Sequence, residues 1–125
     1  MSDIRTYDEL IAAGVPRSTI GSRCRSGRYH RLLPRTYALR EPTPLMRCLA
    51  VTRWQPTAVL SHRTAAWLHG WIDEPVVIEA TVPPRIRART PKWLVLHRRT
   101  LDAGDIAESW SLPTVSATRA LVDCG

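Results

Sequence analysis

Residues 7–39 contain two short helical patterns, each ended by a single glycine, and then two β-prone runs; this order of elements limits the folds open to the chain. The segment 7–13 (YDELIAA) combines early acidic residues with an apolar side, and Gly14 follows it as a C-cap glycine does. Pro16 suits the first turn of a second helix, which Gly27 ends. The pattern predicts a winged helix-turn-helix.

The second helix is expected to turn a small, polar and cationic face outward. Ile20 and Cys24 lie four residues apart, so both fall on the inward side of a helix that turns by about 100° per residue. The opposite face and its flanks then carry hydroxyl and guanidinium groups, which bind DNA bases and phosphates. The predicted DNA-contact residues of this helix are Arg17, Ser18, Thr19, Ser22, Arg23 and Arg25.

Residues 29–39 are expected to form the hairpin, or wing, with Pro34 and Arg35 between its strands. In such a unit the helix residues reach base edges in the major groove, whereas arginines of the wing suit phosphates or the minor groove. The predicted contacts in or beside the wing are Arg28, Arg31 and Arg35.

Seven arginines and no acidic residue lie between Val15 and Arg40. An arginine-rich solvated surface is the plainer alternative, but an ordinary surface mixes both signs of charge. The net charge of +7 favours a polyanionic partner. We expect nucleic acid rather than a membrane, because the sequence has no basic amphipathic helix and no long apolar run.

The residue types also limit how bases could be distinguished. The chain has no asparagine, and its one glutamine, Gln55, lies outside the predicted recognition helix, so the usual bidentate pairing to adenine is not available there. Base discrimination is expected to depend on Arg25 or Arg17 at guanine, on serine and threonine contacts, and on DNA shape.

The fold class is predicted to be α+β, with a winged helix-turn-helix domain at residues 1–41 and a small α/β domain at residues 42–125. The prolines at residues 42–44 mark the boundary between them. The first helix of the second domain is expected to complete the packing of the two preceding helices. The predicted elements of this domain are helices near 45–54 and 61–69, strands near 76–82, 93–97 and 112–115, and a terminal helix near 117–124.

A second basic segment connects the first two predicted strands of this domain. It is a basic connection without acidic residues that could contact a DNA backbone, and a solvated loop is the alternative. Its basic residues are Arg85, Arg87, Arg89 and Lys92.

We expect no catalysis, no cofactor and no metal site. Ser61 and His62 supply a nucleophile and a base without a third orienting group at a recognisable spacing. His62 and His69 are seven residues apart on one helix, or about 10 Å, which is too far for metal pairing across adjacent turns. The acidic residues Asp73 and Glu79 lack the acid-x-Lys arrangement of a metal-dependent nuclease.

The cysteines and tryptophans are expected to have structural rather than functional roles. Three widely spaced cysteines indicate reduced thiols in a cytoplasm, with Cys24 in the core. The five tryptophans all follow the wing in a chain without phenylalanine, so we expect them to fill the core rather than to stack on bases.

Five runs of the sequence resemble actinobacterial AbiEi-type proteins, the antitoxin and transcriptional-regulator half of type IV toxin-antitoxin systems. They are AAGVPRSTIGSRCRSGRYHRLLPRTYAL, AVLSHRTAAWLHG, TVPPRIRAR, LVLHRR and LPTVSATRALVDCG. The resemblance implies an N-terminal winged helix-turn-helix that binds operator DNA, and an adjoining α/β region. The chain differs from that family in lacking the usual first helix, in having Arg23 at an apolar position, and in replacing a glycine-containing wing turn with Pro34-Arg35-Thr36.

These observations predict a sequence-specific repressor that binds double-stranded DNA in the cytoplasm as a homodimer, either antitoxin-like or a phage or prophage regulator. The dimer is expected because a single recognition face this small gives little specificity. The resemblance leaves room for a toxin encoded nearby as a partner. Two alternatives stay open: an antitoxin or interaction module that binds protein or RNA, and an accessory remnant of a Vsr-like endonuclease.

Overall fold

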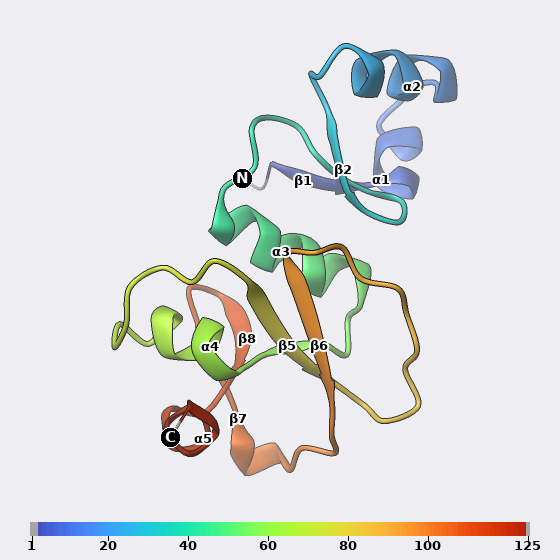
Figure 1. The fold of residues 1–125 in the computed structure, drawn as a ribbon. Coiled ribbons are helices and arrows are strands. Elements are labelled where there is room, and N and C mark those ends of the chain that lie inside the picture. Colours follow the sequence, from blue (N-terminus) through green and yellow to red (C-terminus); the bar gives the residue numbers. More distant parts are fainter. Residues whose placement is uncertain (1–2, 125) are drawn as a thin grey trace. The chain divides into compact units, whose positions relative to one another are not determined.

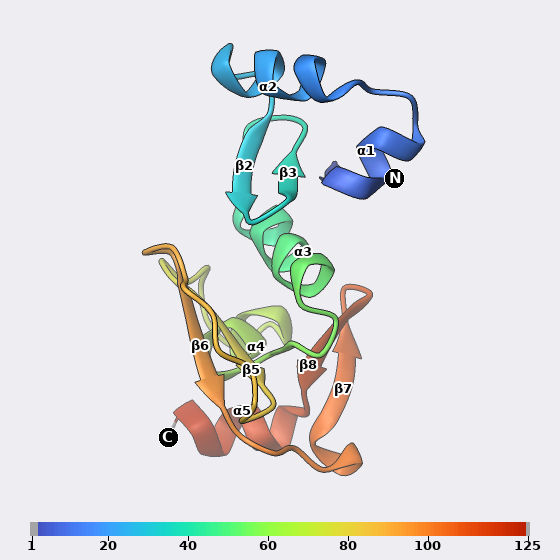
Figure 2. The ribbon, with the colours of Figure 1, turned by 90° about the vertical axis from the view of Figure 1, so that its right-hand side faces the viewer.

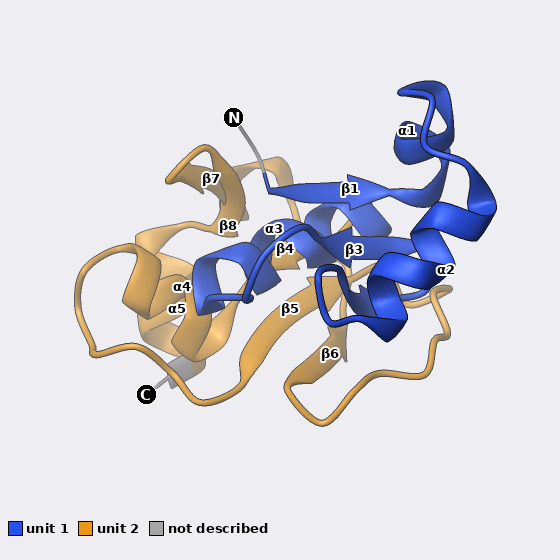
Figure 3. Cartoon of the chain, turned by 90° about the horizontal axis from the view of Figure 1, so that it is seen from above, with its two compact units in different colours: residues 1–56 blue, residues 57–125 orange. Residues whose placement is uncertain are grey.

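The computed structural model describes residues 3–124, and the chain divides into two compact units, unit 1 (residues 1–56) and unit 2 (residues 57–125) (Figure 3). The described residues form five α-helices and two β-sheets, so the fold class is α+β, as predicted. The boundary follows residue 56 rather than residue 41, because the helix over Pro44–Trp54 packs on the sheet of unit 1.

Unit 1 is built around a three-stranded antiparallel sheet. The strand order is β1-β3-β2, so the first strand of the chain lies beside the second strand of the hairpin. The helix-turn-helix and the hairpin are therefore joined through a strand that was not predicted from the sequence. The elements are β1 (Ile4–Thr6), α1 (Tyr7–Ala12), α2 (Arg17–Arg25), β2 (His30–Leu33), β3 (Thr36–Ala38) and α3 (Pro44–Trp54) (Figures 1 and 2).

Local signals explain where α1 and α2 begin and end. Thr6 caps α1 by accepting the backbone N–H of Glu9, while the Glu9 carboxylate accepts the backbone N–H of Thr6. Gly14 and Gly27 follow the two helices with φ values of 89° and 79°, in the left-handed region that favours glycine. The predicted helix stops are confirmed.

The two β-strands of the wing are also confirmed, with a two-residue turn at Pro34-Arg35. Arg35 has φ 56°, a left-handed conformation that costs a non-glycine residue energy. Its guanidinium lies 4.6 Å from the centroid of the Tyr7 ring and 2.7 Å from the Asp8 carboxylate. These contacts offset the strain at the turn that lacks glycine.

The core of unit 1 lies on both faces of the sheet. Tyr37 packs with Leu10 of α1 and Ile20 of α2. Because side chains alternate along a strand, its neighbour Ala38 faces the other side. Ala38 is fully buried, and α3 packs across all three strands. Helix α3 was expected to complete the packing of α1 and α2, but it packs mainly on the three strands and so completes this unit by covering the sheet.

Unit 2 contains a mixed five-stranded sheet of order β6-β5-β4-β8-β7. The pairs β5–β6 and β4–β8 are parallel, and the other two are antiparallel. Strands β4 and β7 were not predicted from the sequence. The elements are β4 (Val59–Leu60), α4 (His62–Leu68), β5 (Ile78–Val82), β6 (Leu94–Arg98), β7 (Ile106–Ser109), β8 (Leu112–Val115) and α5 (Ala117–Cys124), with a short 3-10 turn at Ala103–Asp105.

Helix α4 packs on β5 and β8 and against α5. The buried residues Val59, Ala65, Val115 and Ala120 form the core between these elements.

The tryptophans were expected to fill the core. This prediction is wrong at two positions, because Trp71 is 47% exposed and Trp110 is 69% exposed. None of the helices in the described part is long and apolar enough to cross a membrane.

Candidate nucleic-acid interface and a histidine–glutamate cluster

Positive charge is concentrated in unit 1. Residues 1–56 hold ten of the 18 basic residues and four of the 11 acidic residues, so they carry +6 of the net charge of +7. Two of these acids, Asp3 and Asp8, pair with Arg40 and Arg35. A third acid, Glu9, pairs with Arg53. The arginines of α2 and the start of the hairpin have no acidic side chain within ion-pair distance among residues 3–124; they are Arg17, Arg23, Arg25, Arg28 and Arg31.

Helix α2 is oriented as the sequence predicts. Ile20 is 3% exposed, and Cys24 packs beside it against Leu10 and Tyr37. Thr19 on the flank is half-buried. The exposed face of α2 carries no acidic side chain and consists of Arg17, Ser18, Ser22 and Arg25.

Arg23 has a different environment from the one predicted. It is half-buried, donates a 2.6 Å hydrogen bond to the Tyr29 hydroxyl, and lies 5.3 Å from the centroid of that ring. The backbone N–H of Tyr29 also bonds the Arg23 carbonyl at 3.0 Å. Arg23 therefore holds the end of α2 against Tyr29, the residue that precedes β2.

An open groove runs along the exposed side of α2 to the turn that follows it. All of its lining side chains are hydroxyls or guanidiniums, so it offers hydrogen-bond donors and positive charge to a polyanion. The lining residues are Ser18, Thr19, Ser22, Arg23, Ser26 and Arg28.

The wing arginines differ in their availability. Arg28 and Arg31 are exposed, and neither has an acidic side chain within ion-pair distance among residues 3–124. Arg35 is exposed but paired with Asp8, so a phosphate would have to compete with that carboxylate. Arg28 and Arg31 are thus better placed for a DNA backbone than Arg35.

The predicted second basic segment is the connection between β5 and β6. Its charged side chains are exposed, and one guanidinium, that of Arg87, bonds the carbonyls of Pro84 and Ile86. The exposed charges are Arg85, Arg87, Arg89 and Lys92.

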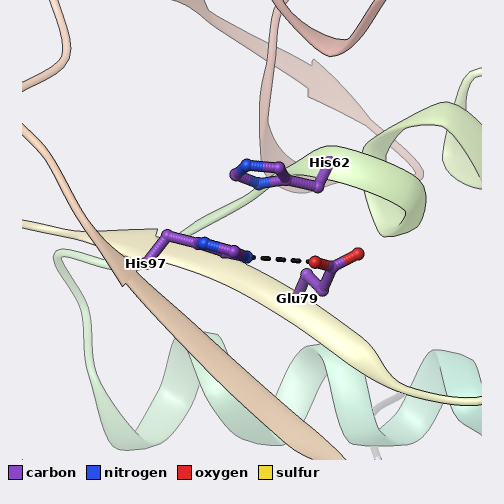
Figure 4. Close-up of side chains that lie close together, drawn as sticks. All are labelled: His62, Glu79 and His97. Carbon is purple, nitrogen blue, oxygen red and sulfur yellow. Dashed lines mark hydrogen bonds and ion pairs between the residues drawn. The ribbon is translucent and has the colours of Figure 1, made fainter. Parts of the chain in front are cut away.

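A separate group of polar residues lies in unit 2, where His62, Glu79 and His97 come together from α4, β5 and β6 (Figure 4). The imidazole rings of His62 and His97 are stacked, with centroids 3.8 Å apart. His97 Nε2 lies 3.0 Å from Glu79 Oε1, within hydrogen-bond distance. The sheet register explains the approach: Thr81 is opposite His97, so Glu79 lies diagonally across from His97 on the same face.

The backbone around this cluster is tied together. The Glu79 N–H donates to Thr64 Oγ1 at 2.8 Å, and its carbonyl accepts the Ser61 N–H at 3.1 Å. The Arg63 N–H lies 3.3 Å from Glu79 Oε2. The start of α4 and the middle of β5 are therefore held in a fixed relation.

His62 has an unusual backbone and a perturbed side chain. Its φ of 54° is left-handed, a conformation that non-glycine residues adopt at an energetic cost and that is frequent at functional sites. Burial lowers the pKa of His62, and the neighbouring imidazole of His97 lowers it further, against the opposing charges of Asp123 and Glu79. Both effects favour the neutral form of the His62 ring.

No metal site was predicted from the sequence, and this cluster was missed. The histidine spacing considered was that of His62 and His69, but His69 lies elsewhere and has Nε2 3.0 Å from the Val115 carbonyl. The cluster uses one residue from each of three elements, and the pairing of β5 with β6 brings two of them together. A signal was present in the alternation of the polar residues Glu79 and Thr81 with apolar residues along β5, which places both polar residues on one face.

Comparison with known proteins adds information on the fold. No protein-family profile matches the chain, and no curated protein matches it by sequence. A crystal structure of the RV2827C protein from Mycobacterium tuberculosis is similar, with a TM-score of 0.59 and 21% sequence identity. The similarity covers 82% of this chain and 42% of that one. The chain thus has the fold of part of a longer protein.

Proposed function

We propose that this protein is a sequence-specific DNA-binding repressor that docks α2 in the major groove of double-stranded DNA. The observation that carries the proposal is the exposed face of α2, which presents Arg17, Ser18, Ser22 and Arg25 without an acid while Ile20 anchors the opposite side. A helix of this width fits the major groove, and a following hairpin suits the flanking backbone.

The contacts fall into two classes. Arg25 and Arg17 on α2 are the residues able to make a bidentate contact to guanine. Arg28 and Arg31 lie at the turn after α2 and on β2, and they neutralise phosphates. Arg23 has a positioning role through Tyr29.

We further propose that two copies bind two half-sites and that the bound protein blocks a promoter in the cytoplasm. The recognition face is one helix of nine residues, so a single copy reads few base pairs. The AbiEi-type resemblance agrees with autoregulation and with a cognate toxin as a further partner. The similarity to the RV2827C protein covers 42% of that longer chain.

The test uses three substitutions and DNA from the region upstream of the protein's own gene, with single base pairs changed in turn. Arg25→Lys keeps the charge but removes the bidentate fork, so we expect preference at one base pair to fall by about tenfold or more while affinity for scrambled DNA is kept. Arg25→Ala should lose the same preference.

Arg31→Ala serves as the matched comparison. It should weaken binding to all DNA sequences alike and reduce the slope of log K against log salt by about one. The assignment of α2 as the recognition helix is wrong if Arg25→Lys leaves the base preferences intact, or if Arg25→Ala and Arg31→Ala have the same effect on every DNA.

A further inference from the structure

We propose that His62, Glu79 and His97 bind a divalent transition-metal ion, with Zn²⁺ as the best match. This site lies in unit 2 and is independent of the DNA-binding proposal for unit 1.

The donor set fits this ion. Two imidazole nitrogens and one carboxylate oxygen are the protein ligands of a zinc site that keeps its fourth position open. Mg²⁺ and Ca²⁺ prefer sites made of oxygen atoms, so two histidines disfavour them. Each of the three residues offers one ligand atom.

The distances require only a local adjustment. The three donor atoms lie within 4.8 Å of one another. Bond lengths of about 2.1 Å in a tetrahedral site place neighbouring donors about 3.4 Å apart. The widest separation must shrink by up to about 1.4 Å, and the stacked rings of His62 and His97 must turn so that their lone pairs converge on the ion. Side-chain rotations can supply both changes, while the backbone of Glu79 is fixed to α4 through Ser61 and Thr64.

Outer contacts orient the His62 ring. Its Nδ1 lies 3.0 Å from Ser61 Oγ, and Ser61 Oγ accepts a hydrogen bond of 2.9 Å from Thr81 Oγ1. Ser61 is fully buried, so this chain of hydrogen bonds is shielded from water. When His62 Nδ1 donates to Ser61, the lone pair on Nε2 is left for the metal, the arrangement that second-shell partners give to histidine ligands.

A cavity beside the two histidines provides room for a fourth ligand. It has a volume of about 220 Å³ and is lined by His62, Thr81, His97, Arg98 and Arg99. A water molecule would fit there, and the two arginines favour an anionic ligand on the metal. The left-handed φ of His62 points independently to a functional role, since the strain persists at a residue that lines both the cavity and the cluster.

The test is calorimetric titration of the full chain with Zn²⁺ and, separately, with Mg²⁺, after treatment with a chelator. We expect one Zn²⁺ per chain with micromolar or tighter affinity, and no Mg²⁺ binding at the same concentrations. Co²⁺ loading provides a second measurement, because a four-coordinate Co²⁺ ion with nitrogen ligands absorbs strongly in the visible range.

Glu79→Gln and His97→Gln should each weaken Zn²⁺ binding by about tenfold or more and remove the Co²⁺ absorption. His30→Gln is the matched control: it removes a half-buried histidine of unit 1 and should leave both measurements unchanged. Thermal unfolding of each variant without metal reports whether its fold is intact, and Zn²⁺ should raise the melting temperature of the wild type but not of the two cluster variants.

The proposal is overturned if the wild-type chain binds no Zn²⁺, or binds Mg²⁺ equally well. It is also overturned if His97→Gln retains wild-type affinity, since that would place the ion elsewhere. None of these results depends on DNA, so failure of the metal site and failure of the DNA-binding proposal are distinguishable.

Discussion

The Glu9 carboxylate connects two helices of unit 1. It accepts the backbone N–H of Thr6 at 2.9 Å and pairs with Arg53 of α3 at 2.9 Å. The hydrogen bond from Thr6 is the largest cause of a lowered pKa at Glu9, and the charge of Arg53 lowers it further against partial burial. A capping contact and an interhelical contact thus depend on one ionised group.

This lowered pKa predicts a pH-dependent contribution to stability. A carboxyl whose pKa is lower in the folded state stabilises the fold above its unfolded pKa of about 4.3 and loses that contribution as pH falls through the folded value. Glu9→Gln should therefore destabilise the protein at pH 7, and the difference from wild type should shrink as pH falls below about 4. Denaturant unfolding at neutral and at progressively more acidic pH measures the free energy of unfolding of both proteins. A difference between them that stays constant with pH would contradict a lowered pKa at Glu9.

The thiols of Cys48 and Cys24 are expected to differ in reactivity, because they differ in burial. Cys48 is fully buried, and burial raises the pKa of its thiol to about 12, whereas Cys24 is half-buried. Because the thiolate is the reactive form, Cys24 should react with a thiol reagent at pH 8 while Cys48 reacts only on unfolding. The measurement is reagent-labelled peptide mapping in a Cys124→Ser background, and early labelling of Cys48 would contradict the buried position.

At the scale of single residues, the sequence predicted the positions that helical periodicity determines. Ile20 and Cys24 face the core and Arg25 faces solvent, as expected. It did not predict that Arg23 packs on Tyr29 or that Asp8 pairs with Arg35, because those partners are set by the tertiary fold. The exposed Trp110 was missed because it lies in a turn between strands, one of which was not foreseen.

The β7–β8 hairpin shows how an element can carry backbone strain. Ser109 pairs with Leu112, so Trp110 and Ser111 form a two-residue turn, and both have positive φ, at 57° and 60°. That conformation is a type I′ turn, for which asparagine and glycine are preferred. The turn is held in place by Trp110, whose Nε1 donates to the Leu68 carbonyl at 3.1 Å.

Relief of this strain gives a prediction for the element. Ser111→Gly should stabilise the protein by about 1 kcal/mol, and Ser111→Asn by a smaller amount, because both residues tolerate the left-handed conformation better than serine. Ser111→Ala should give no gain. Thermal or denaturant unfolding provides the ranking, and equal stability of the glycine and alanine variants would contradict the strain.

At the scale of elements, segments with clear terminal signals were predictable, including the short strands β2, β3 and β8. The helices at 45–54, 61–69 and 117–124 were found because their apolar spacing and terminal signals agree. Strands β1, β4 and β7 were missed because they are short and, unlike the wing strands, do not lie on both sides of a recognisable turn within one β-prone run. The histidine–glutamate cluster depends on the pairing of β5 with β6, and strand order is not visible in local sequence.

For the whole molecule, the uneven distribution of charge is the property most relevant to function. Unit 1 carries +6 and unit 2 carries +1, so a polyanion is attracted mainly to the unit that holds α2 and the hairpin. The exposed loop with Arg85, Arg87, Arg89 and Lys92 is the main basic feature of unit 2. Substitution of these residues tests whether the loop contributes to the proposed DNA binding.

Neutralisation of this loop therefore gives a prediction for the whole chain. If the loop contacts phosphates as proposed, substitution of all four basic residues by serine should lower affinity for specific and scrambled DNA equally and leave the preference between them unchanged. Competition binding at one salt concentration measures the affinities of the variant and the wild type for both DNAs. A selective loss of preference would mean that unit 2 distinguishes bases.

The most direct test of DNA binding is fluorescence anisotropy of the full chain with DNA from its own upstream region and with a scrambled duplex, at low and at physiological salt. We expect a preference of about a thousandfold or more that persists at physiological salt. Equal, steeply salt-dependent binding to both duplexes would contradict specific recognition by α2 and would reduce the arginines of unit 1 to a non-specific attraction for polyanions.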